Sequence, residues 1–284
     1  MSKPSLKDID IVIAISDLHC GCQMGLCPPG GFLLDGGGKY KLSRTQKQSW
    51  TWWREFWRDW VPVVTSGRPY AIVLNGDAMD GRHHGSTTQI SQNLADQQKI
   101  AEAVLRPVIN CKKVIAYYHI RGTEAHSGPS SEQEEHLAKS LGAAPRHGNY
   151  ARNELLKTLG QGKDQYLLHF AHHIGTTSSA SYESTAVHKE LVSAYLAAAR
   201  WGRQLPDAII RGHRHRFLKT EWPTKRDRAI SIVLPGWQGK TPFIFRTGMK
   251  MQPPQFGGVM LRVSDEGELY ERHFVKSFQS ERPE

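Results

Sequence analysis

The sequence predicts an α/β fold that forms one large domain. Short apolar runs rich in β-branched residues alternate with segments of helical periodicity, which is the pattern of strands connected by helices. Several of these runs end in a carboxylate or an imidazole, and ligands of open α/β sheets bind beyond the carboxyl ends of the strands. The chain of 284 residues can bury a substantial core, and one domain is preferred over two small ones.

The first apolar run, residues 11–15, indicates a strand buried on both faces, and it leads into Asp17 and His19. Residues 20–43 follow and are rich in Gly and Pro without periodicity. A loop of this length inside a compact domain is usually functional or mobile. We therefore expect a flap over about residues 20–43, close to Asp17 and His19.

Residues 44–60 have the pattern of a helix and contain five of the eight tryptophans, at positions 50, 52, 53, 57 and 60. An aromatic stripe on one helix face is typical of core packing. A platform on which nucleic-acid bases stack is the alternative. We favour the core, and we expect Trp52 to be the most exposed of the five.

The second strand is predicted at residues 69–74 and leads into Asp77. The loop that follows, residues 78–86, contains four more side chains of interest: Asp80, Arg82, His83 and His84. A helix over residues 89–106 should end at Pro107, because proline lacks the backbone N–H that would continue the hydrogen-bond ladder.

The third strand is predicted at residues 113–120, and the loop after it contains Glu124 and His126. Ser131 and Glu134 have the spacing of a capping box, in which the two side chains satisfy backbone N–H groups at the start of a helix. We expect that helix to stop near residue 142.

The fourth and fifth strands are predicted at residues 166–171 and 207–210, and they lead into two pairs of histidines: His172, His173, His213 and His215. A helix over residues 182–201 lies between them, with one apolar face made of Val187, Leu191, Tyr195 and Ala198. Further strands are predicted at residues 229–234, 259–263 and 270–275. The last five residues, 280–284, have the character of a loose tail.

The overall charge is strongly basic. The chain has 37 Lys and Arg against 27 Asp and Glu, a formal net charge of +10, and a pI of about 9.5. A basic surface favours polyanions such as nucleic acid, or phosphorylated substrates in general, although a diffuse charge that serves solubility is an equal alternative. No apolar run approaches the roughly 18 residues of a membrane helix, and the N-terminus lacks the features of a secretory signal. We expect a cytoplasmic protein without membrane association.

Four cysteines are present, and three of them, Cys20, Cys22 and Cys27, lie within eight residues of the Gly/Pro-rich segment, while Cys111 is separate. Their spacing is not the paired C-x-x-C of a zinc site. Reduced thiols of a cytosolic protein are therefore favoured over a zinc site.

Five separate apolar runs end in potential metal ligands, as follows: Asp17 and His19, Asp77, Glu124 and His126, His172 and His173, and His213 and His215. Any one of these residues has a simple structural explanation, such as a capped turn or a surface histidine. Five strand ends that place imidazole and carboxylate at one edge of a sheet would assemble a polynuclear metal site. The set as a whole therefore indicates metal chemistry.

These residues resemble the calcineurin-like metallophosphoesterase superfamily, whose pattern runs D-x-H, G-D, G-N-H-D/E, H and G-H-x-H. The chain has Asp17-Leu-His19, Gly76-Asp77, a variant around Gly122, His172 or His173, and Gly212-His213-Arg-His215. Four of the five blocks match in order between residues 11 and 216. The resemblance implies a two-sheet α/β sandwich flanked by helices, with residues 1–284 as a single phosphoesterase domain.

The resemblance also implies the ligand set. Asp17, His19 and His215 would hold one metal, Asp77 would bridge two, and the second would be held by the pair His172 and His213, with His173 as the alternative to His172. A carboxylate bridge lets two divalent cations sit roughly 3.5 to 4 Å apart, where they acidify a bound water and hold phosphoryl oxygens. Mixed nitrogen and oxygen ligands suit Mn, which we favour, and also Fe, Zn or Ni.

The third block departs from the family pattern. Thr123 replaces the Asn that binds the second metal, Glu124 replaces the His that protonates the leaving group, and His126 follows two positions later. We expect a shifted loop in which His126 takes over a lost task, preferably protonation of the leaving group, while Thr123 or a water fills the Asn position. His84 or His83 are alternative acids.

Three arginines are candidates for binding the substrate phosphate, since guanidinium matches phosphate with two hydrogen bonds: Arg82, Arg121 and Arg211. Each is equally plausible as a solvated loop residue. The function expected from these features is a dinuclear metal-dependent hydrolase of phosphodiesters, acting on a phosphate ester that could be nucleic acid or a nucleotide. A DNA or RNA nuclease of the same superfamily and a non-catalytic scaffold are the alternatives. The sequence does not indicate an oligomeric state.

Overall fold

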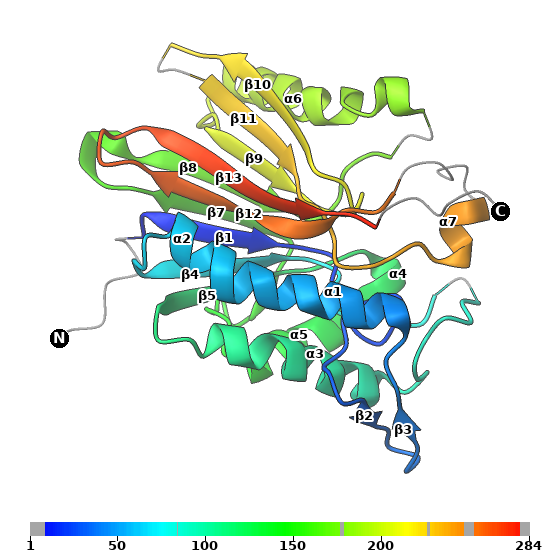
Figure 1. The fold of residues 1–284 in the computed structure, drawn as a ribbon. Helices are drawn as coiled ribbons and strands as arrows, with labels where there is room; N and C mark the ends of the chain where they lie inside the picture. The colour runs from blue at the N-terminus through cyan, green and yellow to red at the C-terminus, as the bar shows by residue number, and fades with distance from the viewer. Residues whose placement is uncertain (1–8, 84, 177–178, 226–227, 247–252, 279–284) are drawn as a thin grey trace.

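The computed structural model describes residues 9–83, 85–176, 179–225, 228–246 and 253–278, and two β-sheets form its centre (Figure 1). The first sheet has the order β13 (Leu269–Lys276), β12 (Phe256–Val263), β1 (Ile11–Ile15), β4 (Tyr70–Asn75), β5 (Val114–Ile120) and β6 (Ala151–Arg152). The second has the order β10 (Leu218–Pro223), β11 (Arg228–Val233), β9 (Ala208–Arg211), β8 (Tyr166–Ala171) and β7 (Glu154–Leu159).

Each sheet has a parallel centre and antiparallel edges. In the first sheet β1, β4, β5 and β6 run parallel, whereas β12 and β13 are antiparallel to their neighbours. In the second, β8, β9 and β11 run parallel, and β7 and β10 are antiparallel. The carboxyl ends of the parallel strands in each sheet therefore share one edge, which is where ligand sites form in such folds.

The two sheets pack face to face around a shared apolar core. Val12 and Val73 from the first sheet belong to the same buried cluster as Leu168, Phe170 and Ile210 from the second. Two sheets packed in this way, with helices on their outer faces, confirm the predicted two-sheet α/β sandwich.

Helices cover both outer faces (Figure 1). The first sheet is covered by α1 (Arg44–Glu55), which continues through a π-helical turn (Phe56–Trp60) into α2 (Val61–Val64), together with α3 (Leu94–Ile109) and α5 (Glu132–Ser140). The second sheet is covered by α6 (Thr185–Trp201), whose Val187 and Leu191 are buried against it. None of the described helices is long and apolar enough to cross a bilayer.

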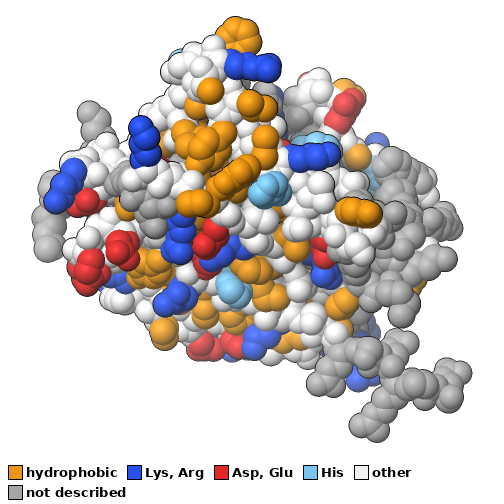
Figure 2. Space-filling model, turned by 90° about the horizontal axis from the view of Figure 1, so that it is seen from above, with side chains coloured by type: hydrophobic (Ala, Val, Ile, Leu, Met, Phe, Trp, Pro, Cys, Tyr) orange, Lys and Arg blue, Asp and Glu red, His pale blue; other side chains and the backbone are white. Residues whose placement is uncertain are grey.

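The outer face of α6 presents apolar side chains to solvent. Leu196 and Trp201 of this helix and Trp222 of the neighbouring β10 are among the large hydrophobic side chains that are exposed. Figure 2, which looks down on this side of the molecule, shows hydrophobic side chains gathered there. The predicted apolar face of the helix covers the sheet at Val187 and Leu191, and Tyr195 packs beside Leu191, whereas Leu196 and Trp201 lie on the exposed side.

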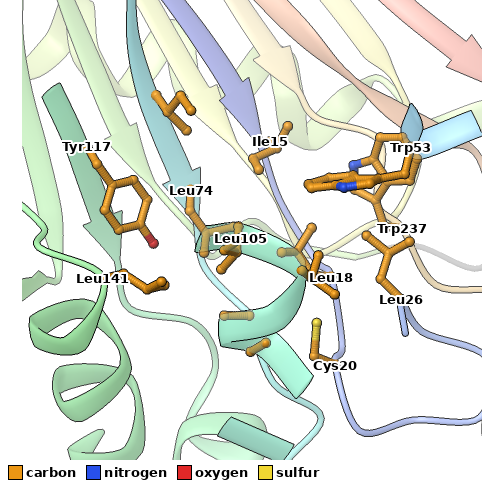
Figure 3. Close-up of a cluster of buried hydrophobic side chains, with 14 of the residues drawn as sticks. Ile15, Leu18, Cys20, Leu26, Trp53, Leu74, Leu105, Tyr117, Leu141 and Trp237 are labelled. Carbon is orange, nitrogen blue, oxygen red and sulfur yellow. The ribbon is translucent and has the colours of Figure 1, made fainter. Parts of the chain in front are cut away.

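The tryptophan-rich helix packs into the core, as predicted. Trp53 is buried and meets Trp237 edge to face, with ring centroids 4.9 Å apart (Figure 3). Trp52, which was predicted to be the most exposed of the five, is half-buried like Trp50, Trp57 and Trp60, with its ring 5.2 Å from that of Phe256 and 4.8 Å from that of Phe278. The segment after β13 folds back over α1, a contact that helical periodicity cannot reveal.

Trp53 should be a strong contributor to stability. Trp53→Ala removes a large buried side chain and leaves a cavity, so we expect the free energy of unfolding to fall by about 3–5 kcal/mol. Trp201→Ala is the matched control, because Trp201 is 75% exposed, and it should change stability by less than about 0.5 kcal/mol. Urea denaturation of both variants measures the difference, and equal midpoints would contradict the assignment of Trp53 to the core.

Two predicted helix signals are wrong in detail. Helix α3 starts at Leu94 after the cap Asn93, and it continues past Pro107 to Ile109. Proline there removes one backbone hydrogen bond in the last turn, where the helix is about to end, so the cost is small. Ser131 does precede α5, but its side chain makes no capping hydrogen bond. The Glu134 carboxylate instead accepts a hydrogen bond from the backbone N–H of Gly122, at 2.6 Å.

Part of the Gly/Pro-rich segment is ordered. It contains a small hairpin of β2 (Phe32–Leu33) and β3 (Lys39–Tyr40), and its first residues pack into the core, where Cys20, Cys22 and Cys27 are buried. Each of the four cysteines is a free thiol. Burial raises the pKa of Cys22 to about 11 and that of Cys27 to about 12, so these thiols stay protonated and unreactive at neutral pH. A flap function for residues 20–43 stays a prediction.

Several elements were not predicted, namely the strands β2, β3, β6, β7 and β10 and the helices α4 (Glu124–Ser127) and α7 (Pro242–Arg246), with two 3-10 turns at Gly162–Asp164 and Ala180–Tyr182. The predicted tail, residues 280–284, lies outside the described residues.

Candidate metal centre

Six of the predicted ligands come together at the shared edge of the two sheets. They follow β1, β4, β8 and β9, and we call them the Asp/His cluster: Asp17, His19, Asp77, His172, His213 and His215. Asp17 and Asp77 are buried, as are His19 and His172. Strands from both sheets contribute, so the cluster forms only when the sandwich is assembled.

The cluster divides into two groups of three. In the first triad, His215 Nε2 lies 3.1 Å from Asp17 Oδ1 and also 3.1 Å from His19 Nε2. The ligand atoms of this triad lie within 4.8 Å of one another, a spacing at which one ion can be held by all three.

In the second triad, His172 Nε2 lies 3.0 Å from Asp77 Oδ2, and His213 completes the group within the same 4.8 Å limit. His172 also lies 3.8 Å from Asp17 Oδ1, so the two triads adjoin. Between the adjacent histidines, His172 is buried against Asp77, whereas His173 is exposed and meets the His213 ring at 4.7 Å.

The backbone of the cluster is strained. Eight described residues other than glycine have a positive φ, and five of them belong to the cluster: Asp17 (56°), His19 (44°), Asp77 (50°), His213 (71°) and His215 (50°). The left-handed region costs such residues on the order of 1–3 kcal/mol each, and conformations of this kind persist mainly at functional sites. The concentration of strain here therefore indicates function more strongly than the residue types alone.

Two glycines allow the strand ends to meet. A Cβ on Gly76, whose φ is 90°, would lie 2.3 Å from His172 Nδ1, and a Cβ on Gly212 would lie 2.2 Å from Ser16 Oγ. Backbone hydrogen bonds then join the same segments, from Asp17 N to the Gly76 carbonyl at 3.0 Å and from Gly212 N to the His172 carbonyl at 2.9 Å. The glycines of the G-D and G-H blocks are thus required by packing.

Three imidazoles are oriented by oxygen atoms on their outer side. His172 Nδ1 lies 2.6 Å from the Asn75 carbonyl, and His126 Nδ1 lies 2.6 Å from the Asp80 carbonyl. Since a carbonyl only accepts, Nδ1 carries the proton in both rings. His19 Nδ1 lies 3.3 Å from Asp80 Oδ1. Such contacts are the usual support for metal-binding histidines, and they leave the Nε2 atoms facing the cluster.

The buried carboxylates of the cluster are stabilised by positive charge around them. Burial alone would raise the pKa of Asp17 and Asp77, but the charges of His215 and His172 outweigh it and hold both pKa values well below the usual range. Burial disfavours charged imidazole, yet the surrounding carboxylates raise the pKa of His19 and His172 to about 10. Without a cation, the protons on these histidines neutralise the charge of the buried carboxylates. A bound metal ion would neutralise the same charge and displace the protons.

The donor set fits a divalent metal. Two carboxylates and four imidazoles are the mixed ligands that Mn, Fe, Zn or Ni accept. Asp17 Oδ1 is buried, and no described residue donates a well-aligned hydrogen bond to it. A buried acceptor without a donor is costly, and a bound cation would satisfy it.

The altered third block also reaches the cluster. Thr123 N donates to Asp77 Oδ1 at 2.8 Å, and the Thr123 hydroxyl lies 3.3 Å from the same oxygen. The single turn of α4 then brings His126 inward, so that its Nε2 lies 4.0 Å from Asp77 Oδ2 and its ring 4.5 Å from that of His19. Glu124 is exposed. His126, Asp77 and His19 form a further group with metal-ligand spacing.

The loop histidines and the three candidate arginines differ in placement. His83 contacts the His126 ring at 4.3 Å, while His84 lies outside the described residues. Arg211 is buried and donates to Glu190 of α6 at 2.6 Å, on the outer face of the sheet, because side chains along a strand alternate between faces. Arg82 is exposed and donates to the Gln92 carbonyl. Arg121 stays beside the third block, at the end of β5.

Asp80 has a role that the sequence did not reveal. It is buried, and besides His19 its carboxylate accepts hydrogen bonds from Gln89 Nε2 at 2.9 Å and Gln238 Nε2 at 3.2 Å. A carboxylate three positions after Asp77 was visible in the sequence, but nothing marked it as the support of an imidazole. Glu134 was missed in the same way, since its spacing suggested a helix cap.

Asp80 should tune metal affinity through His19. Asp80→Asn keeps the size of the side chain and removes the charge that orients the imidazole, so we expect the affinity for Mn to fall about 10- to 100-fold. Asp59→Asn, at an exposed position on the π-helical turn, is the matched control. Calorimetric titration with Mn measures both, and equal affinities would show that Asp80 does not support the site.

Comparison with known proteins finds solved structures of low similarity only. No protein-family model matches the chain, and no curated protein matches it. Vps29 of Chaetomium thermophilum is 10% identical over 94% of this chain and 98% of its own, with a TM-score of 0.39. A hypothetical protein from Thermus thermophilus is 12% identical over 94% and 99%, with a TM-score of 0.41. A Thermotoga maritima protein is 11% identical over 95% and 100%, with a TM-score of 0.31. Likeness at this level assigns neither a family nor an activity to the chain.

Proposed function

We propose that the chain is a dinuclear metal-dependent phosphoesterase of the calcineurin-like type that hydrolyses phosphodiesters. The observation that carries this proposal is the pair of adjoining Asp/His triads on strained backbone at the shared edge of the sheets. When bound, two divalent cations would supply an acidified water and a clamp for the phosphoryl oxygens. Manganese is favoured, with Fe, Zn and Ni as alternatives.

In this proposal each triad holds one cation. Asp17, His19 and His215 hold the first, His172 and His213 hold the second, and Asp77 serves both. The position of Asp77 supports the bridging role, because its Oδ2 lies 3.0 Å from His172 Nε2 of one triad and 4.0 Å from His19 Nε2 of the other. His172 is preferred over His173, since only His172 is buried against Asp77.

His126 is better suited to bind a cation beside Asp77 and His19 than to protonate the leaving group. Burial, followed by the charge of His19, lowers the pKa of His126 to about 4, so the ring is neutral at neutral pH. Its Nδ1–H is directed to the Asp80 carbonyl, which leaves the Nε2 lone pair toward Asp77. A neutral ring with a free lone pair is a ligand, and His126 would thus add a donor beside Asp77 and His19, while the Thr123 hydroxyl holds Asp77.

Two alternatives remain in different classes. A nuclease would use the same cluster on a polynucleotide, and the net charge of +10 favours such a substrate. A scaffold that has lost activity would not need the cluster. Five residues in left-handed conformations cost stability, and a scaffold would gain by losing them, so their presence favours catalysis.

The test compares the metal-stripped protein with the same protein reloaded with Mn, Zn or Ni. Elemental analysis should find about two ions per chain, as a dinuclear site requires. The reloaded protein should hydrolyse bis(p-nitrophenyl) phosphate faster than p-nitrophenyl phosphate, and the stripped protein should hydrolyse neither. Absence of bound metal together with absence of turnover would overturn the proposal in favour of a scaffold.

A further inference from the structure

A cleft of about 470 Å³ opens where the ends of β5, β6 and β8 meet the turn at residues 146–149. Its lining comprises Arg121, Arg146, His147, Asn149, Ala151, Arg152, Asn153, Glu154, His169 and Ala171. Two chain segments connect it directly to the metal centre. Ala171 immediately precedes His172, and Arg121 immediately precedes Gly122, whose position touches Asp77. The cleft therefore lies at the same edge of the sheets as the Asp/His cluster.

The cleft is strongly cationic. Three arginines line it, against one carboxylate, that of Glu154, which is 60% exposed and lies 3.1 Å from His169. The Nε–H groups of Arg121 and Arg152 are buried and find no acceptor among the described residues. These two atoms are enclosed by the protein, so the attraction for an anion comes from the charge of the three guanidinium groups that line the cleft.

The Arg152 side chain and the backbone of the turn at Arg146 are held in place before any ligand binds. Arg152 packs over the ring of Tyr118, 5.2 Å from its centroid, and donates to the Ala144 carbonyl. The turn that carries Arg146 is fixed by hydrogen bonds in both directions between Arg146 and Asn149, at 2.8 and 3.0 Å. His147 and Gly148 adopt positive φ values of 51° and 84°, as a tight two-residue hairpin turn requires.

The carboxylate of Glu135 secures the same loop to α5. It accepts hydrogen bonds from the backbone N–H groups of Tyr150 and Ala151, each at 2.8 Å, and lies 3.8 Å from Arg121. The loop therefore has little freedom to move, and little ordering entropy is lost when a ligand binds.

We propose that this cleft is a second phosphate subsite, which binds a phosphate group that neighbours the scissile diester in the same substrate. The inference rests on the proposed phosphodiesterase function and adds a substrate class, namely diesters that carry a further phosphate. Phosphate is the anion that matches the cleft, since each planar guanidinium can donate two parallel hydrogen bonds to it. The volume is of the size that ligand sites have, roughly 300–1,000 Å³.

The test uses two esters that differ only in the second phosphate. Thymidine 5′-(p-nitrophenyl phosphate) has one phosphate, and its 3′-phosphorylated form has two. With the Mn-loaded protein we expect the second phosphate to raise kcat/KM by at least about tenfold, mainly through KM. Arg146→Met should abolish most of this advantage and leave the one-phosphate ester unaffected. Arg146→Lys should retain part of it, because the charge remains.

Controls separate the possible failures. Arg200→Met, at an exposed position on α6, should behave as the unmodified protein. Equal kcat/KM for the two esters, or an advantage that Arg146→Met leaves intact, would overturn the subsite while the phosphodiesterase function stands. Lack of turnover of both esters would remove the proposed function itself. A tetranucleotide substrate identifies the source of the second phosphate. If Arg146→Met slows its hydrolysis, the source is a nucleic-acid strand, and if the protein does not hydrolyse the tetranucleotide, the source is a free nucleotide. Both results are consistent with the subsite.

Discussion

Asp77→Asn is expected to lower kcat/KM for bis(p-nitrophenyl) phosphate by on the order of 10³-fold, which corresponds to about 4 kcal/mol of transition-state stabilisation. Asp77 is a buried carboxylate in contact with three histidines of the site. Its Oδ2 lies 3.0 Å from His172 Nε2 and 4.0 Å from both His19 and His126. Asparagine keeps the shape of the side chain and removes the charge that two cations would share.

The measurement combines turnover with metal content. Asp77→Asn should retain the fold, because Asn tolerates the left-handed backbone found at this position, and it should bind fewer ions than the unmodified chain. Asp59→Asn, on the exposed side of the π-helical turn, controls for the chemical change alone and should keep full activity. Unimpaired hydrolysis by Asp77→Asn would exclude the dinuclear mechanism.

His126→Ala is the change with the second-largest expected effect. If His126 is a metal ligand, as proposed, its loss should reduce both bound metal and turnover, the latter by on the order of 10²-fold or more. The reduction should be similar for esters with a good leaving group, p-nitrophenolate, and a poor one, an alkoxide. His136→Ala, at an exposed position on α5, is the matched control.

The same pair of esters tests the acid role that the sequence favoured. A general acid matters only when the leaving group needs a proton, so loss of an acid would spare the p-nitrophenyl ester and slow the alkyl ester. Unchanged metal content with such a selective loss would assign His126 to protonation. Unchanged turnover of both esters would remove His126 from the mechanism.

The strands of the sandwich could be predicted from local pattern because most are buried on both faces. Residues 11–15 and 166–171 are apolar runs of strand length, and the structure has strands at these positions. β7 and β10 were missed because they lie at sheet edges, where half of the side chains meet solvent. Exposed residues alternate with buried or half-buried ones in β7, and β10 begins with Leu218 and ends at the exposed Pro223.

The candidate site was predictable to the extent that its residues directly follow strands. The strand-end pattern marked the six cluster residues together with Glu124, His126 and His173, and the resemblance to the metallophosphoesterases then selected the six. The role of Asp80 in supporting His19 could not be predicted. Its carboxylate is held by a hydrogen bond from Gln238, which is 158 positions away in the sequence. The position of the Arg211 side chain could not be predicted either. It points to α6 because of the register of β9 in the sheet, which the sequence pattern does not reveal.

The left-handed backbone of the cluster has a consequence for how the protein tolerates substitution. At Asp17, His19 and Asp77 a glycine would relieve the steric conflict at Cβ, and asparagine would relieve part of it. At the proposed metal ligands, a substitution that relieves backbone strain would therefore also remove a metal donor. Variants chosen for heat resistance need to be screened for metal content.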